Sequence, residues 1–281
     1  MIISQLPMLA LPFPMIDPIL LQIGPLAVRW YGLAYVTGIL LGWWYARRLV
    51  SNNTIWGGKP APFGKIDLDD FLVWAALGIV LGGRVGYILF YDLARYLNNP
   101  AEIFAIWRGG MSFHGGALGT LVAMILFSRS RGFSTLSLMD VIATVSTFGL
   151  FFGRIANFIN AELWGRITDV SWGVIFPNGG ELPRHPSQLY EAMLEGLVLF
   201  LLLRIMIFAG GKFAKPGFIA GAWIFFYGVS RIIVEFFRQP DAHIGYLAGG
   251  WLTMGMVLSI PMLMVGAFVM IRAKPNTGSR K

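Results

Sequence analysis

The stretch from Phe71 to Tyr91, FLVWAALGIVLGGRVGYILFY, carries a single charged side chain, that of Arg84. A helix of about 20 apolar residues crosses the hydrocarbon core of a bilayer, so the stretch predicts a transmembrane helix. An ionisable side chain at that depth is costly and is therefore a candidate functional residue. One segment thus indicates both a membrane fold and a polar site within it.

Similar apolar stretches recur along the chain and predict an all-α polytopic membrane protein with seven transmembrane helices. They cover residues 27–46, 71–91, 114–128, 139–158, 189–208, 217–237 and 250–271. The composition agrees, because 56% of the 281 residues are hydrophobic and only 13% are charged. It excludes a disordered chain, a coiled coil and an ordinary soluble enzyme. The chain has no cysteine, so it has no disulfide and no cysteine nucleophile of its own.

The net charge of +8 is better explained by cytoplasmic loops than by a nucleic-acid partner. Lys and Arg number 13 in the loops after spans one, three and five and in the C-terminal tail, against 5 in the opposite loops. This bias predicts an outer N-terminus and a cytoplasmic C-terminus. We expect an outer arm at 1–26, a seven-helix domain at 27–271 and a cytoplasmic tail at 272–281. An arm at 92–113 and a head loop at 159–188 would also lie outside.

Arginines gather in the outer half of the predicted membrane domain, which suggests one shared anionic partner at headgroup depth. They are Arg29, Arg84, Arg154 and Arg231. Arginine suits phosphate because its planar fork donates two parallel hydrogen bonds and stays charged. The alternative is ion pairing, with Glu191, Glu195 and Glu235 as partners. Tyr227 lies one turn before Arg231 and either faces the same site or belongs to an interfacial belt.

Three motifs could carry chemistry. In the first, from Gly109 to Gly116, glycines surround His114 and would let a ligand approach the backbone. Histidine suits general-base work near neutral pH, although His114 could equally cap a helix.

The second motif runs from Gly153 to Gly165 and would place Arg154, Asn157 and Glu162 near the outer surface. The alternative is that its asparagines end a helix and that Glu162 is solvated. The third motif runs from Pro183 to Glu191, where His185 contacts substrate or only organises the loop.

These segments resemble the prolipoprotein diacylglyceryl transferase family. The stretch from Gly153 to Gly165 matches the family pattern G-R-x-[GA]-N-F-x-N-x-E-x-x-G throughout. Residues 29–33, 82–87, 184–191 and 231–238 and the His114 run also resemble the family, in its order. The resemblance covers nearly the whole chain and departs mainly at 166–183 and at His243.

The resemblance implies a seven-helix protein of the bacterial cytoplasmic membrane with a small periplasmic head and arms. It implies transfer of the sn-1,2-diacylglyceryl group from phosphatidylglycerol to the lipobox cysteine of a prolipoprotein signal peptide, with release of glycerol-1-phosphate. This chemistry needs no metal or other cofactor. The family's essential positions fall on Tyr31, His114, Arg154, Asn157, Glu162, Gly165, Tyr227 and Arg231, with His185 also implicated.

In the mechanism that we expect, His114 takes the proton of the substrate thiol, and Arg154 and Arg231 stabilise the leaving phosphate. Asn157, Tyr31 and Tyr227 would orient the lipid. Glu162 would hold an arginine or anchor the head loop. In a rival assignment, an arginine-centred network activates the thiol and His114 only orients it.

Two other function classes compete with transfer. A transporter or lipid flippase would need polar residues in the cytoplasmic half of the membrane. The sequence offers little there beyond Asp140, which we expect to be an acid at the N-terminus of its own helix. An intramembrane hydrolase would need a serine or aspartate nucleophile with a base, and no motif supports one.

Overall fold

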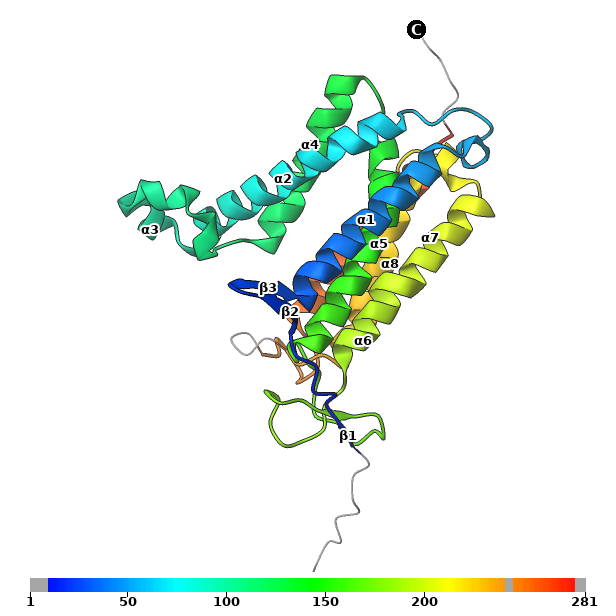
Figure 1. Cartoon of the computed structure of the whole chain (residues 1–281). Helices are drawn as coiled ribbons and strands as arrows, with labels where there is room; N and C mark the ends of the chain where they lie inside the picture. The colour runs from blue at the N-terminus through cyan, green and yellow to red at the C-terminus, as the bar shows by residue number, and fades with distance from the viewer. Residues whose placement is uncertain (1–9, 241–244, 276–281) are drawn as a thin grey trace, which may run out of the picture. The chain divides into compact units, whose positions relative to one another are not determined.

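The computed structural model describes residues 10–240 and 245–275. Helical segments occupy all seven predicted stretches (Figure 1). They are α1 (Trp30–Val50), α2 (Lys65–Tyr91), α4 (Phe113–Arg131), α5 (Thr135–Ile159), the run formed by α6 (Ser187–Glu191), η4 (Ala192–Val198) and α7 (Leu199–Phe208), α8 (Phe218–Glu235) and α9 (Met254–Arg272). The chain divides into two compact units, unit 1 (residues 1–45 and 140–281) and unit 2 (residues 46–139).

Within the described residues, four helices are long and apolar enough to cross a membrane. They are α2, α5, α8 and α9. The protein is therefore a mostly helical membrane protein with several spans. The count of seven spans and the direction of crossing stay predictions. Residues 1–9 of the predicted arm, His243 and residues 276–281 of the predicted tail lie outside the described part of the chain.

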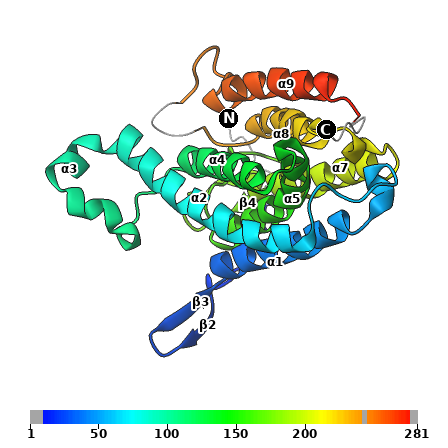
Figure 2. The same cartoon turned by 90° about the horizontal axis from the view of Figure 1, so that it is seen from above.

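In unit 1, helices α1, α5, α7 and α8 run side by side (Figure 1). A Cβ atom on Gly38 of α1 would lie 3.1 Å from the Cα of Gly149 in α5, so the two helices touch backbone to backbone. Helices α8 and α9 also pack directly against each other (Figure 2). Small residues at these crossings let helices approach closely, as is common in membrane bundles.

The sequence predicted that Asp140 is an acid at the N-terminus of its own helix, and this prediction is wrong. Its buried carboxylate accepts hydrogen bonds from the backbone nitrogens of Gly217 and Ala220, each at 2.7 Å, at the start of α8. The carboxylate thus satisfies amides that the first turn of α8 leaves unpaired. Asp140 joins two helices of unit 1, a contact that local spacing could not predict.

The first predicted span begins at Trp30 rather than at residue 27, because residues before it form a hairpin. Strand β2 (Ile19–Ile23) pairs antiparallel with β3 (Leu26–Arg29), and Gly24 takes a positive φ of 58° at the turn. Strand β1 (Leu11–Pro12) pairs in parallel with β4 (Val174–Ile175) of the head loop. The described part of the predicted arm is therefore extended rather than helical.

The head loop has a small core of its own, in which aromatic rings gather around β1 and β4. The rings of Phe13, Phe158 and Phe176 lie 5.4–5.9 Å apart, and Phe176 is fully buried. This core fixes the chain where it leaves α5 and so positions the end of the second motif.

Unit 2 is built on the close packing of α2 against α4. A Cβ atom on Gly119 would lie 2.0 Å from the carbonyl oxygen of Gly78, and one on Gly115 would lie 2.3 Å from that of Gly82. The predicted arm at 92–113 contains α3 (Leu93–Asn98) and the 3₁₀ turns η2 (Pro100–Phe104) and η3 (Ile106–Arg108). It joins the end of α2 to the start of α4.

Candidate active site

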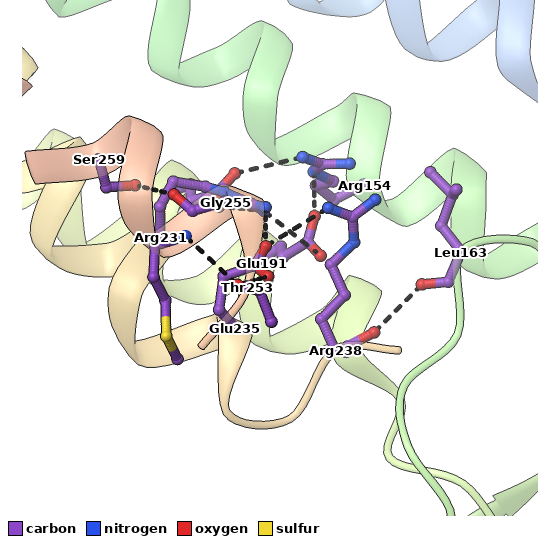
Figure 3. Close-up of polar contacts among 12 residues, drawn as sticks. Arg154, Leu163, Glu191, Arg231, Glu235, Arg238, Thr253, Gly255 and Ser259 are labelled. Atoms are coloured by element: carbon purple, nitrogen blue, oxygen red, sulfur yellow. Dashed lines mark hydrogen bonds and ion pairs between the residues drawn. The ribbon is translucent and has the colours of Figure 1, made fainter. Parts of the chain in front are cut away.

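Unit 1 holds a network of ion pairs at the ends of α5, α6 and α8, drawn in Figure 3. We call it the charge network; its members are Arg154, Glu191, Glu195, Arg231, Glu235 and Arg238. Arg154 Nε lies 2.6 Å from Glu191 Oε2, and Arg231 Nη1 lies 3.3 Å from Glu195 Oε1. Arg231 also pairs with Glu235 one turn later in α8. The ion pairs that the sequence left open as an alternative are therefore present.

The formal charges of the charge network cancel, with three arginines and three glutamates. Glu191 and Glu195 are 1% and 0% exposed, and buried carboxylates need such partners because their desolvation is costly. The side chain of Arg154 is 22% exposed, twice the 11% of Arg231. Arg154 thus has the more exposed side chain, and Arg231 is the more deeply buried of the two among the carboxylates.

Both glutamates project from the same irregular stretch of helix. Glu191 ends α6, and Glu195 lies in η4, a π-helical segment that continues into α7. Short π-helical insertions occur frequently at functional sites. Glu195 Oε2 also lies 3.5 Å from Arg154 Nη2, so this one carboxylate contacts both arginines. Apolar periodicity predicts a plain helix here and gives no sign of this segment.

The second motif closes on itself beyond the end of α5. Asn157 Nδ2 donates to Glu162 Oε1 at 2.7 Å, and Gln188 Nε2 donates to the Glu162 carbonyl at 2.6 Å. Of the two roles predicted for Glu162, these contacts favour the anchor of the head loop. The residues on either side, Ala161 and Leu163, have positive φ angles of 51° and 57°. Such strain in non-glycine residues collects at functional sites.

Gly165 acts through its lack of a side chain. A Cβ atom at this position would lie 2.5 Å from the carbonyl oxygen of Phe237 and 2.7 Å from that of His185. The next residue, Arg166, donates from Nη2 to the Glu235 carbonyl at 2.7 Å and from Nε to the Arg238 carbonyl at 2.9 Å. The head loop is therefore attached to the end of the helix that carries Arg231.

His185 lies in the head loop and is not a member of the charge network. Its Nδ1 lies 3.1 Å from the hydroxyl of Tyr190, which also accepts from Trp172 Nε1 at 2.7 Å. The ring packs against Phe237. Partial burial, and next the positive charge of Arg166, lower the pKa of His185 below its usual value of 6.5. These contacts fit a residue that organises the loop.

Tyrosines flank the charge network from two helices. Tyr31, at the start of α1, lies 3.2 Å from Tyr35 through their hydroxyls, and Tyr35 is close enough to Arg154 and Glu162 to feel both charges. Tyr227 of α8 stacks on Trp223 with ring centroids 5.0 Å apart and lies near Glu195 and Arg231. Unit 1 thus places Tyr227 beside Arg154 and Arg231, joins Asn157 to Glu162 and holds Tyr31 against Tyr35; the roles of these residues stay predictions.

The other two predicted arginines have different surroundings. Arg29 ends β3 and is exposed. Arg84 belongs to unit 2, where its guanidinium donates to backbone carbonyls of the arm at 92–113. The acceptors are Ile103, Gly109, Gly110, Glu102 and Ala105. That Arg84 also contacts substrate stays a prediction.

His114 is exposed in the first turn of α4 in unit 2. The helix cap is Ser112, whose hydroxyl accepts from the backbone nitrogen of Gly115 at 3.2 Å, so His114 does not cap α4. Across residues 10–240 and 245–275, histidine, aspartate and glutamate side chains form no group of three that could hold a metal ion.

Comparison with known proteins gives concordant results. The family model described as "Prolipoprotein diacylglyceryl transferase" matches residues 18–272. Proteins from Brucella anthropi, Brucella canis and Brucella ovis are 59%, 60% and 59% identical to this chain over 273 residues. Each alignment covers 97% of both proteins. All three relatives carry the name phosphatidylglycerol--prolipoprotein diacylglyceryl transferase.

Proposed function

Since the chain belongs to the prolipoprotein diacylglyceryl transferase family, we propose that it moves a diacylglyceryl group from phosphatidylglycerol to a prolipoprotein. The acceptor is the lipobox cysteine of the signal peptide. Its sulfur forms a bond to C3 of the glyceryl group while the C3–O bond to phosphate breaks. Glycerol-1-phosphate leaves with the electron pair of that bond, and the thiol proton goes to a base.

The observation that carries this proposal is that Arg154 and Arg231 both contact the buried carboxylate of Glu195, while the side chain of Arg154 stays partly exposed. The leaving phosphate gains negative charge as the C3–O bond breaks. Hydrogen-bond donors that are already oriented stabilise such charge without reorganisation, most strongly where water is scarce. We assign that role to Arg154 and Arg231, and we assign orientation of the lipid to Tyr31, Tyr227 and Asn157.

The carboxylates of the charge network explain how two charged arginines are stabilised in a membrane when no substrate is bound. Glu191, Glu195 and Glu235 balance the arginine charges and fix the guanidinium planes. When the phosphate arrives, it meets donors that need no further ordering. The neutral network also limits nonspecific attraction of anions, which favours a ligand that can use both guanidinium groups.

We assign the thiol proton to His114, whose exposed ring lies in the first turn of α4. A free thiol has a pKa of about 8.5, so a base raises the fraction of reactive thiolate near neutral pH. The test is His114→Gln with single-turnover transfer measured against pH. An unchanged rate and pH profile would transfer the base role to the arginine-centred network.

We further propose the membrane orientation. All seven helical stretches cross the bacterial cytoplasmic membrane, the N-terminus lies in the periplasm, and the C-terminus lies in the cytoplasm, in agreement with the excess of Lys and Arg in the inner loops. The charge network then opens toward the periplasmic leaflet, where signal peptides arrive. Periplasmic labelling of an Asn160→Cys variant tests this, since the natural chain has no cysteine.

The reaction is tested with the purified full chain, phosphatidylglycerol labelled in its headgroup glycerol and a lipobox peptide. Release of labelled glycerol phosphate that requires the peptide cysteine supports transfer. A peptide with serine in place of that cysteine is the control. Release with the serine peptide would indicate a hydrolase instead. No release with either peptide would contradict both the transferase and the hydrolase activity.

A further inference from the structure

The charge network continues into α9 through Glu235. This carboxylate is 3% exposed, and its Oε1 faces Arg231 and Arg238. Its Oε2 accepts a hydrogen bond of 2.7 Å from the hydroxyl of Thr253, which is 2% exposed. Figure 3 shows Thr253 and Glu235 turned toward each other below Arg231. No motif in the sequence points to Thr253.

Thr253 is also the N-cap of α9. Its Oγ1 accepts from the backbone nitrogen of Met256 at 3.3 Å while the same hydroxyl donates its proton to Glu235. Capping restricts the directions in which the hydroxyl can donate, and the Glu235 carboxylate lies in one that remains. The positive end of the α9 dipole adds to the attraction for this carboxylate.

Gly255 leaves the space that the Glu235 carboxylate occupies against α9. A Cβ atom at this position would lie 2.5 Å from both the carboxyl carbon and Oε1 of Glu235. A rigid contact this short would displace Glu235, because real Cβ atoms do not approach so closely. The first turn of α9 therefore binds the Glu235 carboxylate through the Thr253 hydroxyl and leaves space for it at Gly255.

We propose that Thr253 and Gly255 are positioning residues for the transfer reaction: they seat Glu235, which in turn aims Arg231 at the leaving phosphate. The inference rests on the proposed function, because it gives Arg231 its reacting partner. Without the Thr253 hydroxyl, Glu235 keeps its attraction to Arg231 and Arg238 but loses the contact that fixes its carboxylate plane.

The test is Thr253→Val in the full chain, with kcat and KM for phosphatidylglycerol measured in the peptide assay above. Valine keeps the shape and removes the hydroxyl. We expect kcat to fall about tenfold, the size of one hydrogen bond to a charged group, with KM changed less than about twofold. Thr253→Ser restores the hydroxyl and should restore kcat to within about twofold.

Ser259→Ala is the matched control. Ser259 is 2% exposed in the same helix, and its hydroxyl donates at 2.7 Å to the Gly255 carbonyl rather than to the charge network. We expect this variant to keep kcat. An unchanged kcat in Thr253→Val, or an equal loss in Ser259→Ala, would overturn the positioning role alone. A wild-type chain without cysteine-dependent release would overturn the proposed function, and this inference with it.

Discussion

Arg231 and Arg84 are both buried arginines in predicted transmembrane stretches, with 9% and 5% of the whole residue exposed, yet their partners differ in kind. Arg231 in unit 1 is surrounded by the carboxylates of Glu191, Glu195 and Glu235. Arg84 in unit 2 donates only to backbone carbonyls, through Nε, Nη1 and Nη2 alike. A sequence search for charged residues in transmembrane stretches would not distinguish Arg231 from Arg84.

The difference lies in what each arginine can still do. The five bonds of Arg84 use all five of its N–H groups, so it holds the arm at 92–113 as a structural residue would. Carboxylate partners instead make Arg231 part of a charged site in which an anion can join or replace a partner. We therefore expect loss of Arg231 to affect the reaction and loss of Arg84 to affect folding.

The largest expected effect comes from neutralising the charge network's own cations. Arg231→Gln and Arg154→Gln should each lower kcat by a factor on the order of 10²–10³, because removal of one donor to a developing oxyanion typically has that effect. Single-turnover release of glycerol phosphate measures it. Arg129→Gln, at an exposed arginine near the end of α4, is the control and should keep full activity. Thioether formation at the wild-type rate in both network variants would break the comparison.

Arg84→Lys should act on stability instead. Lysine has three donors in place of five, so at least two carbonyls of the arm lose their partner. An unsatisfied buried group costs about 1–3 kcal/mol, and because most of these hydrogen bonds are only partly buried, we expect the lower end of that range and a melting temperature in detergent that falls by a few degrees. The rate per folded molecule should stay near wild type. A lower rate at unchanged melting temperature would instead mean that Arg84 contacts substrate, as its place in a predicted transmembrane stretch suggested.

Glycines sharpen the comparison at the attachment of the head loop to α8. Gly165→Ala would force a Cβ atom against the carbonyls of Phe237 and His185, and overpacking of this kind costs roughly 1–3 kcal/mol. Gly149→Ala is the matched control, since nothing lies within 4 Å of its added Cβ. Thermal unfolding of the two variants should separate them. Equal melting temperatures would show that the head loop accommodates a Cβ atom at residue 165 without loss of stability.

Much of this fold could be predicted from sequence, because apolar stretches of about 20 residues have few alternatives to helix. The motif from Gly153 to Gly165 also pointed to Arg154, Asn157 and Glu162 as one local group, and the structure joins Asn157 to Glu162, since neighbours along one helix and its exit stay close. The features that sequence could not predict depend on contacts between distant segments. Asp140 at the start of α8, Thr253 beside Glu235 and the carbonyls around Arg84 are such contacts.

Backbone conformation was the other limit. The π-helical segment η4 and the positive φ angles of Ala161 and Leu163 break local preference rather than follow it. The hairpin of β2 and β3 shows the same limit, since its apolar residues fit a helix as well as a strand. The pairing of β2 with β3 decides the hairpin, and local sequence preference accounts for neither the π-helical segment nor the positive φ angles.

The smallest expected effect concerns His185, which lies in unit 1 but outside the charge network. Its folded-state pKa is lowered by burial and by Arg166, whereas the unfolded imidazole titrates at about 6.5. Just below that pH the unfolded chain binds more protons than the folded chain, so stability is lost as pH falls from neutral through about 6.5 towards the lowered pKa and is regained as pH rises. His185→Gln should flatten this slope in melting experiments. Tyr190→Phe removes the hydrogen bond to the ring but leaves Arg166 and most of the burial, so it should keep the slope. An identical slope in wild type and His185→Gln would assign the pH dependence to other groups and leave His185 free to act on substrate.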